Sequence, residues 1–275
     1  WKEAMEGCDY VLHVASPVLM ENPKDENELI TPALEGTKNV LRAASEAGVK
    51  RVVVTSSVAA ILYGRDDEID EDFTFNEEHW TDVNHKNTSA YAKSKTLAEK
   101  AAWEFIEKDS SGMELSVVNP AMVFGPVLEE DYGTSVGVIL EMMSGNYPMV
   151  PNMDMGIVDV RDVADLQLLA MTHPEAAGKR FVCSESNMMM KEQTDFLRDT
   201  FPEFQNKIPT REAPTWFLKL FAFLRPPLKM IAPELGKNRK LDSSRARNLL
   251  GWKPRPAKEA IKSAADSLIK FNTLS

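Results

Sequence analysis

The sequence predicts an α/β protein built on a doubly wound parallel sheet. Three short runs, at residues 10–16, 50–57 and 114–126, have the apolar or β-branched composition of buried parallel strands. Longer segments with helical periodicity separate these runs. Strands and helices that alternate in this way form a parallel sheet with helices on both faces.

The first elements follow directly from composition and periodicity. YVLHVAS (10–16) is short and apolar, which indicates a buried strand. Residues 28–49 carry apolar side chains at helical spacing and end near Gly48, a residue suited to a helix C-terminus. KRVVVTSS (50–57) is rich in valine, so we expect a second strand there.

A long polar segment, residues 63–87, has the composition of a loop and separates the second strand from the next helix. That helix begins after Thr88 or Ser89, either of which can cap its first turn. ELSVVNPAMVFGP (114–126) follows as a strand that leaves into a loop containing proline and glycine.

Beyond residue 125 the alternation of strands and helices is less regular. The sequence indicates a helix at 137–146, a short strand feeding a helix at 156–174, and a strand at 178–184. Residues 186–240 are rich in Met, Phe and Pro, and we expect an irregular smaller lobe there. Residues 241–271 predict two helices separated by a turn near Gly251.

Composition narrows the function classes. The 275 residues include 32 basic and 42 acidic side chains, for a net charge of −10, which argues against nucleic acid or an anionic membrane as a partner. Cys8 and Cys183 lie far apart and in no metal-ligand spacing, and the four histidines form no ligand pattern, so we expect no metal site. Free thiols and the absence of a long apolar run indicate a cytoplasmic protein.

Tyr91 and Lys95 are four residues apart in TSAYAKSKTLAEKAAWEF (88–105), so on a helix they share one face. An ammonium beside a phenol favours the phenolate and lowers its pKa, which would make the phenol a useful acid near neutral pH. The spacing alone also suits an ordinary helix surface, and the context decides between these interpretations.

The carboxyl ends of the three predicted strands carry small, polar or proline-containing segments, at 13–17, 55–57 and 119–126. In open α/β sheets, ligands bind at this edge. The sequence therefore predicts a ligand crevice there.

Taken together, these segments resemble the extended short-chain dehydrogenase/reductases, most closely the dihydroflavonol reductase-like branch with its aldehyde and carbonyl reductases. The stretches that carry the resemblance are GCDYVLHVASP, ALEGTKNVLRAA, KRVVVTSS, NEEHWTD, YAKSKTLAEKAAWEF, NPAMVFGP, VDVRDVADLQLLAM and LLGWKPR. They run nearly from end to end, and their order makes the resemblance specific.

The resemblance implies a catalytic triad of Ser57, Tyr91 and Lys95. In the family the tyrosine protonates the carbonyl oxygen as hydride arrives from the nicotinamide, and the serine hydrogen-bonds that oxygen. The lysine binds the nicotinamide ribose and holds down the pKa of the tyrosine. Further cofactor contacts are implied for Val14, Ala15, Ser16, Ser56, Pro120, Val123 and Ser135.

By the same resemblance the fold is of the Rossmann type, with a dinucleotide-binding domain at 1–124 rejoined by about 156–184. Residues 125–155 and 185–275 would form mainly the substrate-binding lobe and the C-terminal helices. The family begins with a strand, a glycine-rich turn and a helix that hold the pyrophosphate. None of the 13 glycines has that spacing. We therefore expect the chain to lack this N-terminal portion, with its first strand left as an exposed sheet edge.

Three functions remain open. The leading one is NADPH-dependent reduction of a ketone or aldehyde, with NAD possible because the deciding residues are absent, and with a small apolar or aromatic carbonyl substrate. The second is a nucleotide-sugar epimerase or dehydratase, for which Arg161, Arg211, Arg239 and Arg245 could bind the diphosphate. The third is a non-catalytic, cofactor-binding fragment. The protein could be a monomer or a homodimer.

Overall fold

A computed structural model of the chain describes residues 1–18, 23–65, 73–221 and 232–274. Its larger sheet has four parallel strands in the order β1–β2–β4–β8, which confirms a Rossmann-like α/β fold. The strands are β1 (Tyr10–His13), β2 (Arg51–Thr55), β4 (Glu114–Pro120) and β8 (Lys179–Cys183).

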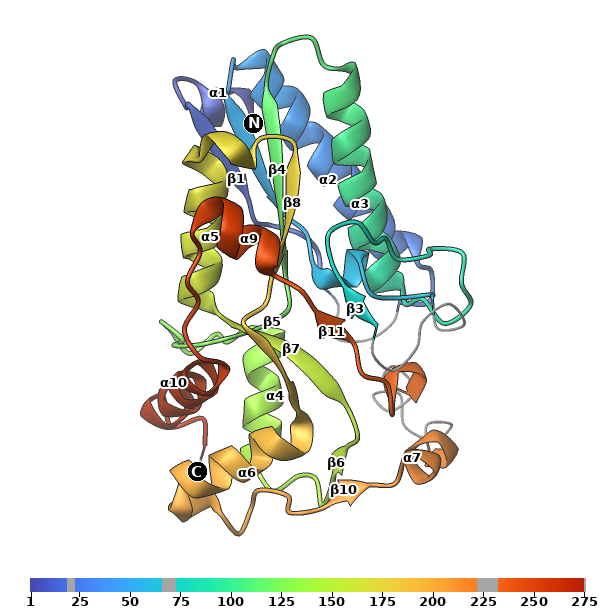
Figure 1. The fold of residues 1–275 in the computed structure, drawn as a ribbon, viewed down its shortest axis with the longest axis vertical. Coiled ribbons are helices and arrows are strands. Elements are labelled where there is room, and N and C mark those ends of the chain that lie inside the picture. Colours follow the sequence, from blue (N-terminus) through green and yellow to red (C-terminus); the bar gives the residue numbers. More distant parts are fainter. Residues whose placement is uncertain (19–22, 66–72, 222–231, 275) are drawn as a thin grey trace.

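Helices cover both faces of this sheet (Figure 1). Helices α2 (Asn27–Glu46) and α3 (Ala90–Lys108) lie on one face, and α5 (Val160–Thr172) and α9 (Ser244–Leu250) lie on the other. The valines of β2 are buried on both faces of the sheet, which explains why this strand is apolar at every one of these positions. Val52 and Val54 pack in the cluster that contains α2 and α3, whereas Val53 packs in the cluster that contains α5 and α9.

A second sheet lies beyond the carboxyl edge of the first (Figure 1). It has the order β5–β7–β9, with β5 (Met122–Phe124) parallel to β7 (Asp154–Asp159) and β9 (Ser186–Met189) antiparallel to β7. Its apolar cluster includes side chains of α4 (Thr134–Met143), α6 (Met190–Thr200) and α10 (Ala257–Lys270).

The remaining elements are short. Two small parallel pairs join β3 (Thr74–Phe75) to β11 (Lys240–Leu241) and β6 (Val150–Pro151) to β10 (Glu212–Ala213). The other helices among the described residues are α1 (Lys2–Met5), α7 (Thr215–Phe221), η1 (Val58–Ala60), η2 (Pro174–Ala176), η3 (Pro202–Phe204) and η4 (Ala232–Glu234). Among the described helices, none is both long enough and apolar enough to cross a membrane.

Two predictions from the sequence were wrong. Residues 114–126 were expected to form one strand, but the chain changes sheets at Ala121, so that β4 pairs with β8 and β5 pairs with β7. Residues 186–240 were expected to be irregular, yet they contain β9 and α6. The Glu192 carboxylate accepts a hydrogen bond from the Met189 amide and so satisfies the start of α6. Residues 222–231 of that segment, and 66–72 of the predicted polar loop, lie outside the described residues.

Strand β1 pairs with β2 alone among the described strands. Tyr10, Leu12 and Val14 alternate along this edge and are exposed. The expected apolar sheet edge is therefore present in the described part of the chain.

Arg51 joins the start of β2 to the end of α5. Its side chain is buried, and one nitrogen, Nη1, donates to the carbonyl oxygens of Ala170, Met171 and His173. Its other nitrogens contact the Glu114 carboxylate on β4. A cation at this position satisfies carbonyls that the last helical turn leaves unpaired.

We expect Arg51→Met to lower the free energy of unfolding by about 3 kcal/mol, because the carbonyls at the end of α5 lose their donor while staying largely buried. Urea denaturation followed by circular dichroism would measure this loss. Lys50→Met is the matched control, because Lys50 is exposed and pairs with the exposed Asp9. Equal stability of the two variants would contradict the assigned role of Arg51.

Candidate active site

Helix α3 places Tyr91 and Lys95 at the carboxyl edge of the larger sheet. The helix begins after Ser89, whose hydroxyl accepts a hydrogen bond from the Ala92 amide at 3.2 Å. Thr88, the residue before Ser89, donates a hydrogen bond from its hydroxyl to the Asp82 carbonyl oxygen at 2.7 Å. Tyr91 and Lys95 therefore lie in the first two turns, and the Lys95 side chain is buried.

Ser57 meets this helix from the end of β2. It caps the short helix η1, because its hydroxyl oxygen accepts from the Ala59 amide at 3.1 Å. The same hydroxyl interacts with the Tyr91 phenol and lowers its pKa. The Lys95 ammonium lies 5.9 Å from the centre of the Tyr91 ring. The fold thus brings together the three residues that the sequence singled out.

Burial dominates the electrostatics of this group. It raises the pKa of the Tyr91 phenol, an effect that the hydrogen bond from Ser57 partly offsets. Burial also lowers the pKa of Lys95 from 10.5 to about 8, against the attraction of Glu99. The expected lowering of the Tyr91 pKa is therefore not seen for the protein alone, because removal of the phenol from water is the largest effect and raises the pKa.

A small pocket opens beside Lys95, where β1, β2 and α3 meet. His13, Ala15, Ser16 and Ser56 are among the residues that line it. His13 is partly buried, and burial, followed by the charge of Lys95, lowers the pKa of its imidazole. Of the residues predicted to bind cofactor, Ala15, Ser16, Ser56 and Lys95 are thus brought together here.

Other predicted cofactor contacts lie on separate elements. Val14 follows β1 and is exposed. Pro120 ends β4 opposite Cys183, and Val123 lies in β5 opposite Val158. Ser135 is in the first turn of α4. These side chains are outside the lining of the pocket beside Lys95, so the geometry does not join them to it.

Sequence reasoning missed Glu99, which lies one turn beyond Lys95 on α3. Its fully buried carboxylate accepts hydrogen bonds from Ser56 Oγ at 2.5 Å, Asn119 Nδ2 at 2.8 Å and Arg180 Nε at 2.5 Å. The spacing of Tyr91, Lys95 and Glu99, each four residues from the next, could have indicated a shared face. Nothing local in the sequence indicates the contact with Arg180.

The segment NEEHWTD (76–82) surrounds the other side of Arg180. Nη1 of Arg180 donates to the carbonyl oxygens of Glu77 at 2.9 Å and His79 at 3.0 Å. The guanidinium carbon lies 3.7 Å from the ring centre of Trp80, as in a cation–π stack. The Glu77 carboxylate accepts from the amide of Val182, so this segment also covers an edge of β8.

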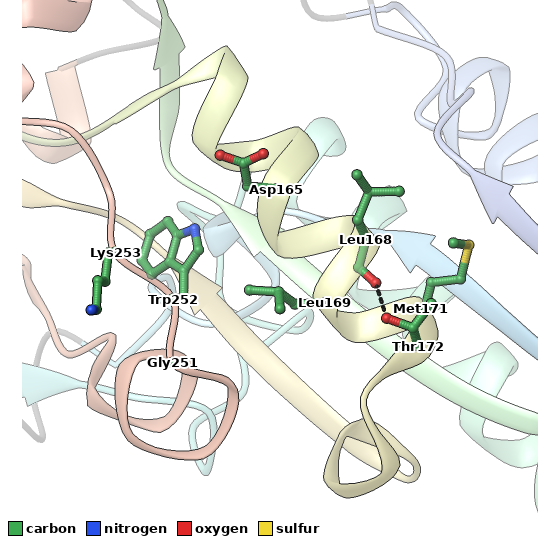
Figure 2. Close-up of a pocket in the computed structure, with 8 residues that line it drawn as sticks. All are labelled: Asp165, Leu168, Leu169, Met171, Thr172, Gly251, Trp252 and Lys253. Atoms are coloured by element: carbon green, nitrogen blue, oxygen red, sulfur yellow. Dashed lines mark hydrogen bonds between the residues drawn. The ribbon is translucent and has the colours of Figure 1, made fainter.

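A separate hollow lies on the outer side of α5. Figure 2 shows its lining, which comes from α5 and from the turn after α9, with Trp252 and Leu169 at its centre. The Trp252 indole donates to the Asp162 carbonyl at 2.9 Å and so fixes that turn against the helix. None of the residues around Lys95 lines this hollow.

A match to a family model shows which protein family the chain belongs to. Residues 1–184 match the model described as the NAD dependent epimerase/dehydratase family. The chain belongs to this family. Members of this family similar to the chain include the NADPH-dependent methylglyoxal reductase GRE2 of Saccharomyces cerevisiae, which is 34% identical over 95% of this chain and 76% of the relative. Cinnamoyl-CoA reductase 1 of Petunia hybrida is 40% identical over 76% of this chain and 60% of the relative.

Solved structures agree with this placement in the epimerase/dehydratase family. The yeast methylglyoxal/isovaleraldehyde reductase Gre2 complexed with NADPH has a TM-score of 0.81 and 33% identity, covering 99% of this chain and 80% of that chain. A UDP-glucose 4-epimerase from Thermotoga maritima has a TM-score of 0.72 at 20% identity. At that identity the likeness shows the fold alone.

The low pKa of Lys95 makes stability depend on pH. The folded-state pKa of about 8 lies below the ordinary value of 10.5, so the unfolded chain binds the extra proton between these values. Burial of the charged amine therefore costs stability below about pH 8, and the cost disappears as the pH rises through 10.5.

We expect Lys95→Met to raise the free energy of unfolding at pH 7 by up to about 3 kcal/mol, because it removes this cost. The gain should shrink steadily as the pH approaches 10. Urea denaturation of the cofactor-free protein at several pH values would measure it, with the exposed Lys86→Met as a control for the replacement itself. A stability difference that does not change with pH would refute the assignment.

Proposed function

We propose that the protein reduces a ketone or aldehyde with NADPH, using Ser57, Tyr91 and Lys95. The observation that carries this proposal is that the Ser57 hydroxyl, which lowers the pKa of the Tyr91 phenol, and the buried Lys95 ammonium both lie beside that phenol. The similarity to NADPH-dependent reductases supports the choice of reaction and cofactor.

The side chains fit such a cofactor. Among the described residues, the Lys95 ammonium makes no hydrogen bond or ion pair with protein, although it is buried next to a pocket. An unpaired cation with three N–H donors suits the hydroxyl groups of a ribose. Ala15 and Ser16 on the pocket wall would approach the same part of the dinucleotide, and we propose Val14, Pro120, Val123 and Ser135 as further contacts.

When bound, the nicotinamide supplies the hydride. The protein's part is to hold the carbonyl oxygen and deliver a proton to it. Ser57 Oγ donates a hydrogen bond to that oxygen, and Tyr91 Oη transfers its proton to it. The positive charge of Lys95 then stabilises the phenolate that remains. Because burial raises the pKa of Tyr91 in the protein alone, the phenol starts fully protonated at neutral pH.

We also propose a division of labour between the two sheets. The four-stranded sheet would carry the dinucleotide, and the second sheet with α4, α6 and α10 would form most of the substrate side. An apolar or aromatic substrate suits this side, where Met122, Met155 and Met188 are only partly buried. Cys8 and Cys183 are free thiols, which supports a cytoplasmic location.

The epimerase alternative is less well supported by the charges. Three of the four arginines that could bind a sugar diphosphate are already held by carboxylates, which leaves exposed Arg211 as the exception. The ion pairs join Arg161 to Asp159 and Glu259, Arg239 to Glu234, and Arg245 to Glu77 and Glu78. Tight binding of a UDP-sugar in calorimetry would restore this alternative.

We expect Tyr91→Phe to lower kcat for carbonyl reduction by at least about 100-fold, because the variant keeps the ring but has no proton to give. The assay follows loss of NADPH absorbance with a panel of aldehydes and ketones. Tyr10→Phe is the control, because that phenol lies on the exposed edge strand. Turnover that survives in the Tyr91 variant would exclude the proposed acid. A folded wild-type protein that binds NADPH but reduces no carbonyl compound would exclude the proposed function.

A further inference from the structure

The Glu99 carboxylate is positioned to organise the turn that carries Ser57. Oε2 of Glu99 accepts from Ser56 Oγ at 2.5 Å and from Asn119 Nδ2 at 2.8 Å. Asn119 Nδ2 also donates to the Ser57 carbonyl oxygen at 3.1 Å. One carboxylate oxygen on α3 is thus linked to residues 56 and 57 by a side-chain hydroxyl and by a shared amide.

This linkage reaches the proposed acid through Ser57. Ser57 interacts with the Tyr91 phenol, and Tyr91 lies two turns before Glu99 on the same helix. The Ser56 amide also donates to the Val118 carbonyl at 2.8 Å, so the turn is held against β4. Glu99 and Tyr91 therefore contact the two ends of one short segment, and α3 sets the distance between them.

Arg180 balances the negative charge of this buried carboxylate. Its Nε donates to the other oxygen, Oε1, while its remaining contacts are neutral carbonyls and the Trp80 ring. Oε2 is consequently free to serve Ser56 and Asn119. One carboxylate oxygen thus pairs with the Arg180 charge, and the other accepts the hydrogen bonds from Ser56 and Asn119. A pair of substitutions can therefore separate these two roles.

We propose that Glu99 is a positioning residue, whose buried carboxylate sets the Ser57 hydroxyl against the Tyr91 phenol through Ser56 and Asn119. The inference rests on the proposed reductase function, because it assigns Glu99 a part in the same site. Glu99 also borders the pocket beside Lys95, but its carboxylate oxygens are engaged by Ser56, Asn119 and Arg180, so we expect its effect to fall on the alignment of the reacting groups. Misalignment by about 1 Å can cost about 100-fold in rate.

Two double variants test this role. Both remove the charge pair, so neither leaves a buried charge without a partner. Glu99→Gln/Arg180→Met keeps an oxygen that accepts from Ser56 and Asn119. Glu99→Leu/Arg180→Met has no such acceptor. We expect the Leu-containing variant to lose about 100-fold in kcat relative to the Gln-containing variant, while KM and the Kd of NADPH change by less than about threefold.

A crystal structure of each variant provides a readout that does not depend on activity. The Ser57 hydroxyl should stay beside the Tyr91 phenol in the Gln-containing variant and move away from it in the Leu-containing one. Equal kcat in the two folded variants, or an unchanged Ser57–Tyr91 distance in both, would overturn the proposal, as would a loss confined to KM. If the wild-type protein reduces no carbonyl compound, the reductase proposal fails and the crystal structures alone decide the role of Glu99.

If the Leu-containing variant does not fold, Ser56→Ala/Asn119→Ala replaces it. This change leaves the Glu99–Arg180 pair intact and removes both hydrogen bonds from the other side. The same loss of kcat and the same displacement of Ser57 from Tyr91 are expected, and wild-type kcat in this variant would overturn the proposal.

Discussion

The structure around the candidate site depends on a single buried charge, the Glu99 carboxylate. A charge removed from water is costly unless it is paired and its remaining lone pairs are satisfied. Arg180 supplies the opposite charge, and Ser56 and Asn119 supply hydrogen bonds. These residues come from the carboxyl end of β2, from β4 and from β8, so satisfying one carboxylate fixes three strands and α3 relative to one another.

The same requirement extends to the loop before α3. Arg180 has donors left over after it pairs with Glu99, and backbone carbonyls of Glu77 and His79 accept from one of its terminal nitrogens, Nη1. Trp80 covers the guanidinium plane. Loss of one partner from such a pair commonly costs about 3–5 kcal/mol. The loop and the strands are therefore coupled by the electrostatics of burial, and the segment that leads into Tyr91 is held by the same network.

How far the sequence predicted these features depends on how local each one is. Helices α2 and α3 and strands β2 and β8 follow from periodicity and β-branched composition, and Tyr91 and Lys95 follow from a four-residue spacing. Ser57 required the family resemblance, because serine is common and its partner lies 34 positions away. The sheet change at Ala121 was missed, although Asn119 and Pro120 interrupt the apolar run just before it. The contact between Glu99 and Arg180, 81 residues apart, and the direction of the Tyr91 pKa shift both required burial to be known.

The sheet change also explains how the second sheet is held close to the site. Where the chain crosses from β4 to β5, Ala121 packs against Gly156 of β7. A Cβ on Gly156 would lie 2.5 Å from Leu241 Cδ1, 3.0 Å from Ser184 Oγ and 3.1 Å from Ala121 Cβ. The leucine tip can turn aside, but Ser184 and Ala121 would have to shift to admit a side chain, so the backbone of β7 lies close to the ends of β4 and β8. Close packing of this kind transmits displacements rather than absorbing them. The proposed substrate side is therefore fixed relative to the strand that carries Asn119, and through Asn119 relative to Ser57.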